Sequence, residues 1–261
     1  IGLEGNDYIY AQDGDDTLIG GLGNDNLRGA NGNDTYVWSV GDGNDTIVET
    51  SGIDQLVLHN VLQSELRFEK SNTYNLKIHI NSEEIVLQSQ FQSDVQNNNY
   101  YDYLQVETLL LDDGTVIDLM NDITFSGTAG NDVVFGLSNS DSSLIGLEGS
   151  DYLYANNGND TLDGGDGTDF LYAGAGNDIL KGGDGIDMLY GQNGSDVFLF
   201  EALTAFNFSD NIQDFKLSQN DKFDVSDLLQ GYDAVTDAIT DFVQITESGS
   251  NSYLSVDADG G

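Results

Sequence analysis

A large apolar residue recurs every nine positions along two stretches of the chain, and each is preceded by a short polar turn. These apolar positions are Ile9, Leu18, Leu27, Tyr36, Ile47 and Leu56 in the first stretch, and Val134, Leu144, Leu153, Leu162, Leu171, Leu180, Leu189 and Phe198 in the second. A single apolar side chain between two outward-facing neighbours is typical of a short strand. Glycine, asparagine and aspartate fill the turns, where glycine adopts positive φ at little steric cost. Two nine-residue phrases therefore predict one 18-residue coil of two strands and two turns.

Stacking such coils at the ~4.8 Å spacing of paired strands makes a parallel β-roll in which residues 18 apart become neighbours. Asp163 and Lys181 would then form a cross-strand ion pair on one sheet. Large side chains would form two adjacent ladders on the other sheet: Tyr154, Tyr172 and Tyr190 in one, and Tyr152, Phe170 and Met188 beside it. These pairings support the predicted register.

The nine-residue period divides the chain into four expected segments within an all-β fold. Residues 1–57 and 127–200 are two parallel β-roll arrays, 58–126 an antiparallel β insert, and 201–261 a β-rich C-terminal cap. In the insert, alternating apolar residues predict strands at Leu66/Phe68, Leu76/Ile78/Ile80 and Leu104/Val106, Asp113-Gly114 predicts a hairpin turn, and 92–103 predicts a polar loop. In the cap we expect strands around Val243/Ile245 and Tyr253–Val256, and a short helix at Ser226–Leu229.

An aspartate stands two residues before almost every apolar position. The candidate metal ligands are Asp7, Asp16, Asp25, Asp34, Asp45, Asp54, Asp132, Asp141, Asp151, Asp160, Asp169, Asp178, Asp187 and Asp196. Two extra residues near Ser39 and one near Ser142 and Ser143 interrupt the count. A single aspartate can be a simple turn former, but fourteen in register favour a shared chemical role.

Calcium is the cation that fits these turns, because it takes six to eight oxygen ligands from carboxylates and backbone carbonyls. Stacking brings the oxygens of turns i and i+2 together, as for Asp160 with Asp178 or Asp169 with Asp187. Counting such pairs predicts several ions, up to about ten. Because each site needs two stacked coils, binding and folding would be one event. We expect an unfolded chain at micromolar calcium and a folded one at millimolar calcium.

The charge of the chain agrees with a cation-binding role. The sequence has 46 acidic and 7 basic residues, a net charge of −39, and no cysteine. Such a chain is a poor partner for nucleic acid or anionic membranes, which would repel it. Direct membrane insertion is not expected either, because no apolar run approaches the ~18 residues of a membrane span. The absence of cysteine excludes disulfides and thiolate metal sites.

The phrase GGDGIDMLY at 182–190 resembles the repeats of the RTX (repeats-in-toxin) proteins, and the resemblance covers 2–57 and 127–199. It implies that backbone carbonyls of each turn join the aspartates as calcium ligands. On this chain those carbonyls would come from Gly5, Gly14, Gly23, Gly32, Gly43, Gly149, Gly158, Gly165, Gly167, Gly176, Gly182, Asp184 and Gly185. Ala11, Ala155 and Ala173 replace the first glycine of the phrase, and Asn139 replaces the glycine at its fourth position. Asn139 and Ser39 therefore mark irregular junctions.

Two further segments carry resemblances. Residues 52–115 resemble the haemolysin-type calcium-binding related domain. The C-terminal part of the chain resembles the C-terminal domain of type I secreted bacterial proteins, often large adhesins, at residues 196–200 and in the segments NIQDFKLSQNDKFDVSDLL and SVDADG. This resemblance implies the C-terminal region of an adhesin or toxin, secreted or held at the bacterial cell surface, with the type I secretion machinery as partner. Because the chain begins within a repeat, we expect a fragment of a longer protein that also lacks the last part of a secretion signal.

No catalytic function is expected for the chain itself. HExxH, GxSxG and GxxxxGK motifs are absent from the sequence. His59 and His79 fall in expected strands of the insert, where a structural role is commoner than a catalytic one.

Two alternative functions remain open. The ladder of Tyr154, Tyr172 and Tyr190 could bind surface carbohydrate, since exposed aromatic patches often bind ligands, unless the C-terminal 60 residues pack over it. The chain could also be the non-catalytic RTX tail of a secreted enzyme whose catalytic domain lies upstream.

Overall fold

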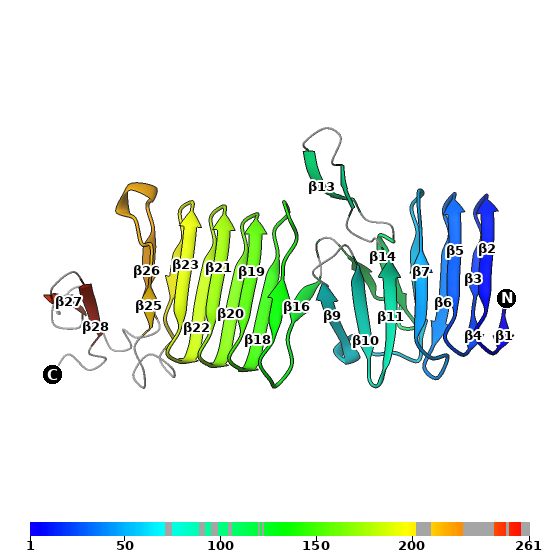
Figure 1. Ribbon diagram of the computed structural model, residues 1–261, viewed down its shortest axis with the longest axis horizontal. Helices are drawn as coiled ribbons and strands as arrows, with labels where there is room; N and C mark the ends of the chain where they lie inside the picture. Colours follow the sequence, from blue (N-terminus) through cyan, green and yellow to red (C-terminus); the bar gives the residue numbers. More distant parts are fainter. Residues whose placement is uncertain are drawn as a thin grey trace.

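The protein is a row of stacked coils that runs from the N-terminus towards the C-terminus (Figure 1). The computed structural model describes residues 1–70, 75–88, 92–94, 99–103, 106–119, 121, 123–201, 210–226, 243–248 and 251–256, with side chains left out at 92–94, 99–103, 243–248 and 251–256. Within these ranges the elements are strands and two short 3₁₀ helices, so the all-β expectation is confirmed. No helix in the described ranges is long and apolar enough to cross a membrane.

One twelve-stranded sheet runs through both arrays and the insert. Its strands, in spatial order, are β2 (Tyr8–Asp13), β5 (Asn26–Asn31), β7 (Asp45–Val48), β11 (Glu83–Gln88), β10 (Leu76–Ile80), β9 (Leu66–Lys70), β16 (Thr124–Ser126), β18 (Ser143–Gly149), β20 (Thr161–Gly167), β22 (Ile179–Gly185), β24 (Val197–Leu199) and β26 (Lys222–Asp224). Strands of the two arrays pair in parallel, which confirms the β-roll.

Two five-stranded sheets form the other side of the roll. The first is β15 (Val116–Asp118), β14 (Thr108–Leu111), β8 (Gln55–His59), β6 (Thr35–Ser39) and β3 (Thr17–Ile19), and the second is β17 (Val133–Phe135), β19 (Tyr152–Asn157), β21 (Phe170–Ala175), β23 (Met188–Asn193) and β25 (Asn211–Ile212). The remaining elements are the strand pairs β1 (Leu3–Glu4) with β4 (Gly21–Leu22), β12 (Gln92–Asp94) with β13 (Asn99–Tyr103) and β27 (Val243–Ser248) with β28 (Asn251–Val256), and the 3₁₀ helices η1 (Gln63–Glu65) and η2 (Leu217–Gln219).

The apolar position of each phrase forms the core, one residue wide. Leu162 pairs with Leu180, and Leu171 with Leu189, as the interval of 18 residues predicts. Of the fourteen predicted core positions, all are buried except Ile9, which lies half-buried at the N-terminal end. Asp163 pairs with Lys181 in the same register, and their side chains form an ion pair of 2.9 Å.

Glycine at the fourth position of the phrase allows the coils to approach closely. At Gly167 (φ +146°) a Cβ atom would lie 1.5 Å from the carbonyl oxygen of Gly149, and at Gly185 (φ +141°) 1.5 Å from that of Gly167. No side chain fits in such a gap, and positive φ is itself unfavourable for other residues. The glycine spacing thus sets the close stacking of the turns.

The irregular junction at Ser39 is absorbed without losing the register. The indole Nε1 of Trp38 donates to the carbonyl of Gly43 (3.1 Å), and the amide of Ser39 donates to Asp42 Oδ2 (2.8 Å). Beyond the two extra residues β7 pairs with β5 in parallel, so the apolar positions Leu27 and Ile47 are again neighbours.

The insert joins the two arrays within the long sheet. Strands β9, β10 and β11 pair in antiparallel fashion, as expected, whereas the outer pairings of β11 with β7 and of β16 with β18 are parallel. Asp113-Gly114 forms the predicted hairpin between β14 and β15. The prediction of a polar loop at 92–103 is wrong for the residues that the structure describes there. They form the strands β12 and β13, which pair in antiparallel fashion, in keeping with the strand propensity of the tyrosines in β13. Leu104, part of an expected strand, lies outside the described residues.

The described part of the cap continues the roll. Strand β25 pairs with β23 and β26 pairs with β24, both in parallel, so two more short strands stack on the last coil. The expected strands near Val243 and Tyr253 are present as the antiparallel pair β27 and β28. The expected helix at Ser226–Leu229 falls outside the described residues apart from Ser226.

Candidate metal sites

The aspartates of the phrase form ladders along both edges of the roll. The backbone N–H of most of them donates to Oδ1 of the aspartate one coil further on, at 2.7–3.1 Å. The rungs are Asp7–Asp25, Asp16–Asp34, Asp25–Asp45 and Asp34–Asp54 in the first array, and Asp132–Asp151, Asp151–Asp169, Asp160–Asp178, Asp169–Asp187 and Asp178–Asp196 in the second. The structure therefore brings together the pairs that were predicted to share ions.

The second carboxylate oxygen of most of these aspartates is buried and has no hydrogen-bond partner among the described residues. This holds for Oδ2 of Asp25, Asp34, Asp54, Asp151, Asp160, Asp169, Asp178, Asp187 and Asp196. A buried carboxylate oxygen without a partner is costly, and protein interiors rarely leave one unsatisfied. A row of such oxygens at the repeat interval fits an oxygen-liganded cation, which would supply the missing partner.

Where the first position of the phrase is glycine, the missing side chain keeps space in front of these oxygens. A Cβ atom on Gly20 would lie 2.1 Å from Oδ2 of Asp25, and one on Gly182 would lie 2.5 Å from Oδ2 of Asp187. The space belongs to the same turns whose glycine carbonyls were predicted as ligands. The donor set is entirely oxygen, which suits calcium rather than a softer metal.

Burial also raises the pKa values of several ladder carboxyl groups in the middle of the arrays. The pKa of Asp160 and Asp169 is raised to about 7, first by desolvation and also by the charges of neighbouring aspartates. Desolvation, together with the charges of neighbouring aspartates and glutamates, raises the pKa of Asp45 and Asp54 to about 7, and desolvation and neighbouring aspartates raise that of Asp178 to about 6. Without a cation, the roll therefore favours partly protonated carboxyl groups at neutral pH.

Asp141, predicted as a ligand, does not lie on the ladder. The ladder position belongs to buried Ser142, whose N–H donates to Asp160 Oδ1 (2.7 Å). Exposed Asp141 instead accepts from the N–H of Asn159 (2.6 Å), one position earlier in the turn. The extra residue of this array thus lies before Ser142, in the turn that contains Asn139, and the prediction of Asp141 as a ladder residue is wrong.

Three acidic residues outside the repeats extend the ladders, and sequence reasoning missed all of them. Asp187 N–H donates to Asp210 Oδ1 (3.1 Å) and Asp196 N–H to Asp221 Oδ1 (3.2 Å), both in the cap. In the insert, Glu107 Oε2 accepts from Asp54 N–H (2.5 Å). Each of the three stands two residues before an apolar residue of a strand, at Ile212, Phe223 and Leu109. That acid-x-apolar spacing is the signal that could have identified them.

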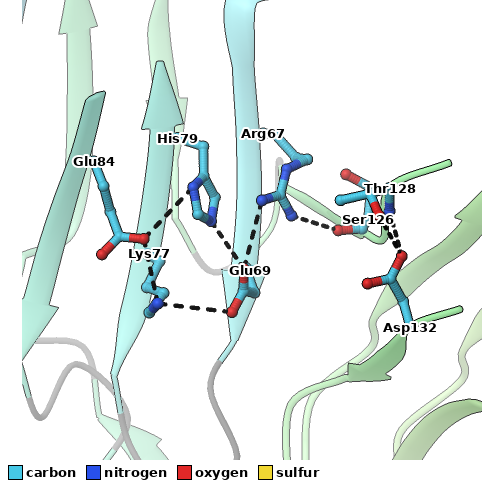
Figure 2. A network of polar contacts seen from close by, with 8 residues as sticks. All are labelled: Arg67, Glu69, Lys77, His79, Glu84, Ser126, Thr128 and Asp132. Atoms are coloured by element: carbon cyan, nitrogen blue, oxygen red, sulfur yellow. Dashed lines mark hydrogen bonds and ion pairs between the residues drawn. The ribbon is translucent and has the colours of Figure 1, made fainter. Parts of the chain in front are cut away.

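The ladder ends are less enclosed than the middle. Asp7 and Asp16, at the start of the first array, are half-buried, as is Asp132 at the start of the second. Oδ2 of Asp132 accepts from the backbone N–H (2.6 Å) and the hydroxyl (2.8 Å) of Thr128 (Figure 2). The end carboxylate of the second array is thus satisfied by protein hydrogen bonds.

The two histidines of the insert take part in polar contacts that hold strands together. His79 on β10 lies between Glu69 Oε2 (2.9 Å) and Glu84 Oε2 (3.6 Å), and Lys77 bridges the same two glutamates (Figure 2). His59 Nδ1 contacts Asp112 Oδ1 at 2.6 Å. These contacts provide a structural role for both rings.

The predicted tyrosine ladder is present on the sheet formed by β19, β21 and β23. Tyr154 stacks on Tyr172 with ring centroids 4.9 Å apart, and Tyr172 on Tyr190 at 4.6 Å. The ring faces therefore cover one another, although all three tyrosines remain partly exposed. Beside the ladder is an open hollow of about 400 Å³, and its lining includes Tyr154, Tyr172, Asn156, Asn157, Gln192 and Asn193. Residues 210–226 of the cap stack on the end of the roll and leave these rings half-exposed.

Comparison with known proteins gave one family and a distant structural match. The family described as the RTX calcium-binding nonapeptide repeat (4 copies) matches residues 1–36, 124–142, 138–171, 145–180 and 172–202. No match was found among curated proteins. Among solved structures, the extracellular lipase LipA from Serratia marcescens is similar, with 17% identity, a TM-score of 0.28, and coverage of 99% of this chain and 36% of the lipase. The chain thus spans little more than a third of that protein.

Proposed function

We propose that this chain is a module that folds when it meets calcium outside the cell. It is an RTX protein, because the calcium-binding repeat family matches both of its arrays. The observation that carries the proposal is the row of nine buried Oδ2 atoms that have no hydrogen-bond partner among the described residues. Each rung needs two stacked coils, so the sites form only as the roll forms. At micromolar calcium the chain is unfolded, and at millimolar calcium it is a rigid roll.

The same coupling supports a role in secretion. A chain that stays unfolded in the low calcium of the cytoplasm can pass through the one-step channel of a type I system and fold only after export. The protein of which it is part is then secreted or held at the bacterial cell surface, as an adhesin or a toxin. The net charge of −39 opposes folding before calcium arrives. In this proposal Glu107, Asp210 and Asp221 join the ladder aspartates as ligands, Asp141 is not a ligand, and the chain itself is not catalytic.

A calcium titration followed by far-UV circular dichroism tests the proposal. Wild type should gain its sheet signal between micromolar and millimolar calcium. Asp160→Asn should need several times more calcium, because it removes a carboxylate from the middle of the ladder. Asp141→Asn is the matched control: it removes the same charge from the off-ladder neighbour and should leave the midpoint unchanged. Full sheet signal in excess chelator would contradict the proposal.

A second candidate function is carbohydrate binding at the hollow beside the tyrosine ladder. The amides of Asn156, Asn157, Gln192 and Asn193 line it together with two tyrosines, and such groups hydrogen-bond sugar hydroxyls. Titration of the calcium-loaded chain with oligosaccharides, against Gln192→Ala, tests this function. Equal binding by both forms, or none by wild type, would exclude the hollow as the site.

A further inference from the structure

Two residues of the first array differ from the usual residues of the phrase, and their side chains are in contact inside the roll. Glu49 stands at the first position of the phrase of Asp54, where glycine is usual, and Tyr36 stands at a core position mostly held by leucine or isoleucine. We propose that Asp34, Glu49 and Asp54 together bind one calcium ion more tightly than the turns with two aspartates. This inference rests on the proposed function and names the site that calcium fills first.

The three carboxylates are close together and enclosed. One oxygen from each lies within 4.8 Å of the others, and the three residues are only 1–2% exposed. Glu49 is held in place by its neighbours: Oε1 accepts from the N–H of Ala30 (2.8 Å) and of Thr50 (2.8 Å), and Oε2 accepts from the Tyr36 hydroxyl. The Tyr36 hydroxyl in turn accepts from the N–H of Gly29 (2.8 Å). Three groups thus hold the Glu49 carboxylate directly, and the N–H of Gly29 positions the Tyr36 hydroxyl that is one of them.

Two further oxygens point to a ligand at this place. Oδ2 of Asp34 and Oδ2 of Asp54 are buried and have no hydrogen-bond partner among the described residues. Oδ2 of Asp34 and Oε2 of Glu49 face the same point above Gly29, where a Cβ atom would lie 2.1 and 2.5 Å from them. Glycine at position 29 keeps that space free of side chain.

Electrostatics favours a divalent cation there. None of the ion pairs found among the described residues includes these three carboxylates. Three buried carboxylates without a counter-charge are strongly unfavourable. A calcium ion offsets two of the charges and accepts the hard oxygen ligands that the cluster offers. Because calcium affinity rises with the number of charged ligands in a rigid site, the third carboxylate makes this site tighter than its neighbours.

The site lies where the first array meets the insert. Asp54 at its edge is hydrogen-bonded through its N–H to Glu107 of the insert, and Asp34 lies one coil back along the roll. Filling it first would fix the last coil of the array against the insert before the remaining turns are loaded.

Calcium affinities from competition with a chromophoric chelator test the proposal on the whole chain. Wild type should show one binding step at least tenfold tighter than the rest. Glu49→Gln keeps the size and most hydrogen bonds of the side chain but removes its charge, so it should abolish the tight step. The double variant Tyr36→Leu with Glu49→Gly restores the usual residues of the phrase, and it should fold with calcium yet also lack that step. Glu4→Gln, exposed in the same array, is the charge-matched control and should retain it.

The outcomes separate the two proposals. A wild type that neither binds calcium nor folds with it overturns both. A wild type that folds with calcium but shows no separate tight step overturns only this inference. So does a tight step that survives in Glu49→Gln, because tight binding would then not depend on the Glu49 carboxylate.

Discussion

At the scale of single residues, the fourth-position glycines decide how closely two turns can stack. Gly167→Ala places a Cβ atom at a positive φ and 1.5 Å from the carbonyl oxygen of Gly149. Both effects are unfavourable, and together they should lower the free energy of unfolding in saturating calcium by at least about 3 kcal/mol. Chemical denaturation followed by circular dichroism measures this loss.

The chain offers a control at the same position of another phrase, where glycine has neither a positive φ nor a close neighbour. A Cβ atom on Gly130 would meet nothing closer than Thr128 Oγ1 at 3.8 Å, because this turn begins the second array. Gly130→Ala should therefore change stability by less than about 1 kcal/mol. If the two alanine variants lost the same stability, neither close stacking nor positive φ would be what requires glycine at this position.

Residue spacing alone identified most of the candidate ligands, because the phrase is local and its period is strict. It failed at Asp141, where one extra residue can be placed on either side of the aspartate without changing the count. Only pairing with the next coil distinguishes the two choices: Ser142 N–H, and not that of Asp141, faces Asp160. A repeat count fixes which residues are candidates, but the hydrogen bonds between coils fix the register.

At the scale of elements, the two described cap strands β25 and β26 act as one more coil of the second array. Their acidic residues Asp210 and Asp221 continue the ladder beyond Asp187 and Asp196. The double variant Asp210→Asn with Asp221→Asn keeps hydrogen-bond acceptors but removes two carboxylates from the last turns. Calcium should then hold β25 and β26 less firmly.

Hydrogen exchange in saturating calcium measures this loosening. Amides of β25 and β26 should exchange about tenfold faster in the double variant, whereas those of β20 should keep their protection. Asp224→Asn is the control, because that side chain contacts Ser226 N–H and lies off the ladder. Unchanged exchange in β25 and β26 would mean that the cap docks by its strand pairing alone.

The sequence predicts the two arrays far better than the insert, and for a physical reason. In the arrays each strand pairs with the strand two phrases away, so the partner follows from the repeat. In the insert, β11 pairs with β7 and β9 pairs with β16, across separations that no local pattern encodes. The alternation of Ile78 and Ile80 shows that a strand exists, but it does not show which neighbour it has.

At the scale of the whole molecule, protons and calcium compete for the same carboxylates. In the folded chain without calcium, burial raises the pKa of Asp160 and Asp169 to about 7 from the ordinary value of 3.8, and that of Asp178 to about 6. A group whose folded pKa is raised stabilises the fold below its unfolded pKa, and this contribution is lost as the pH rises through the folded pKa. The calcium-free roll is therefore least stable above about pH 7 and gains stability as the pH falls towards 4.

Acid should thus partly replace calcium. In excess chelator, the far-UV sheet signal should be small at pH 8 and should grow on titration to pH 5, because protons neutralise the buried carboxyl groups. In millimolar calcium the opposite trend is expected: lowering the pH from 8 to 5 should raise the calcium midpoint, since the ion binds only the deprotonated form. Sodium chloride at equal ionic strength controls for general screening of the −39 charge, which does not distinguish buried from exposed carboxylates. If the calcium-free chain is equally unfolded at pH 5 and pH 8, the charges of the buried aspartates are not what prevents folding. Backbone constraints would then keep the chain unfolded until calcium binds.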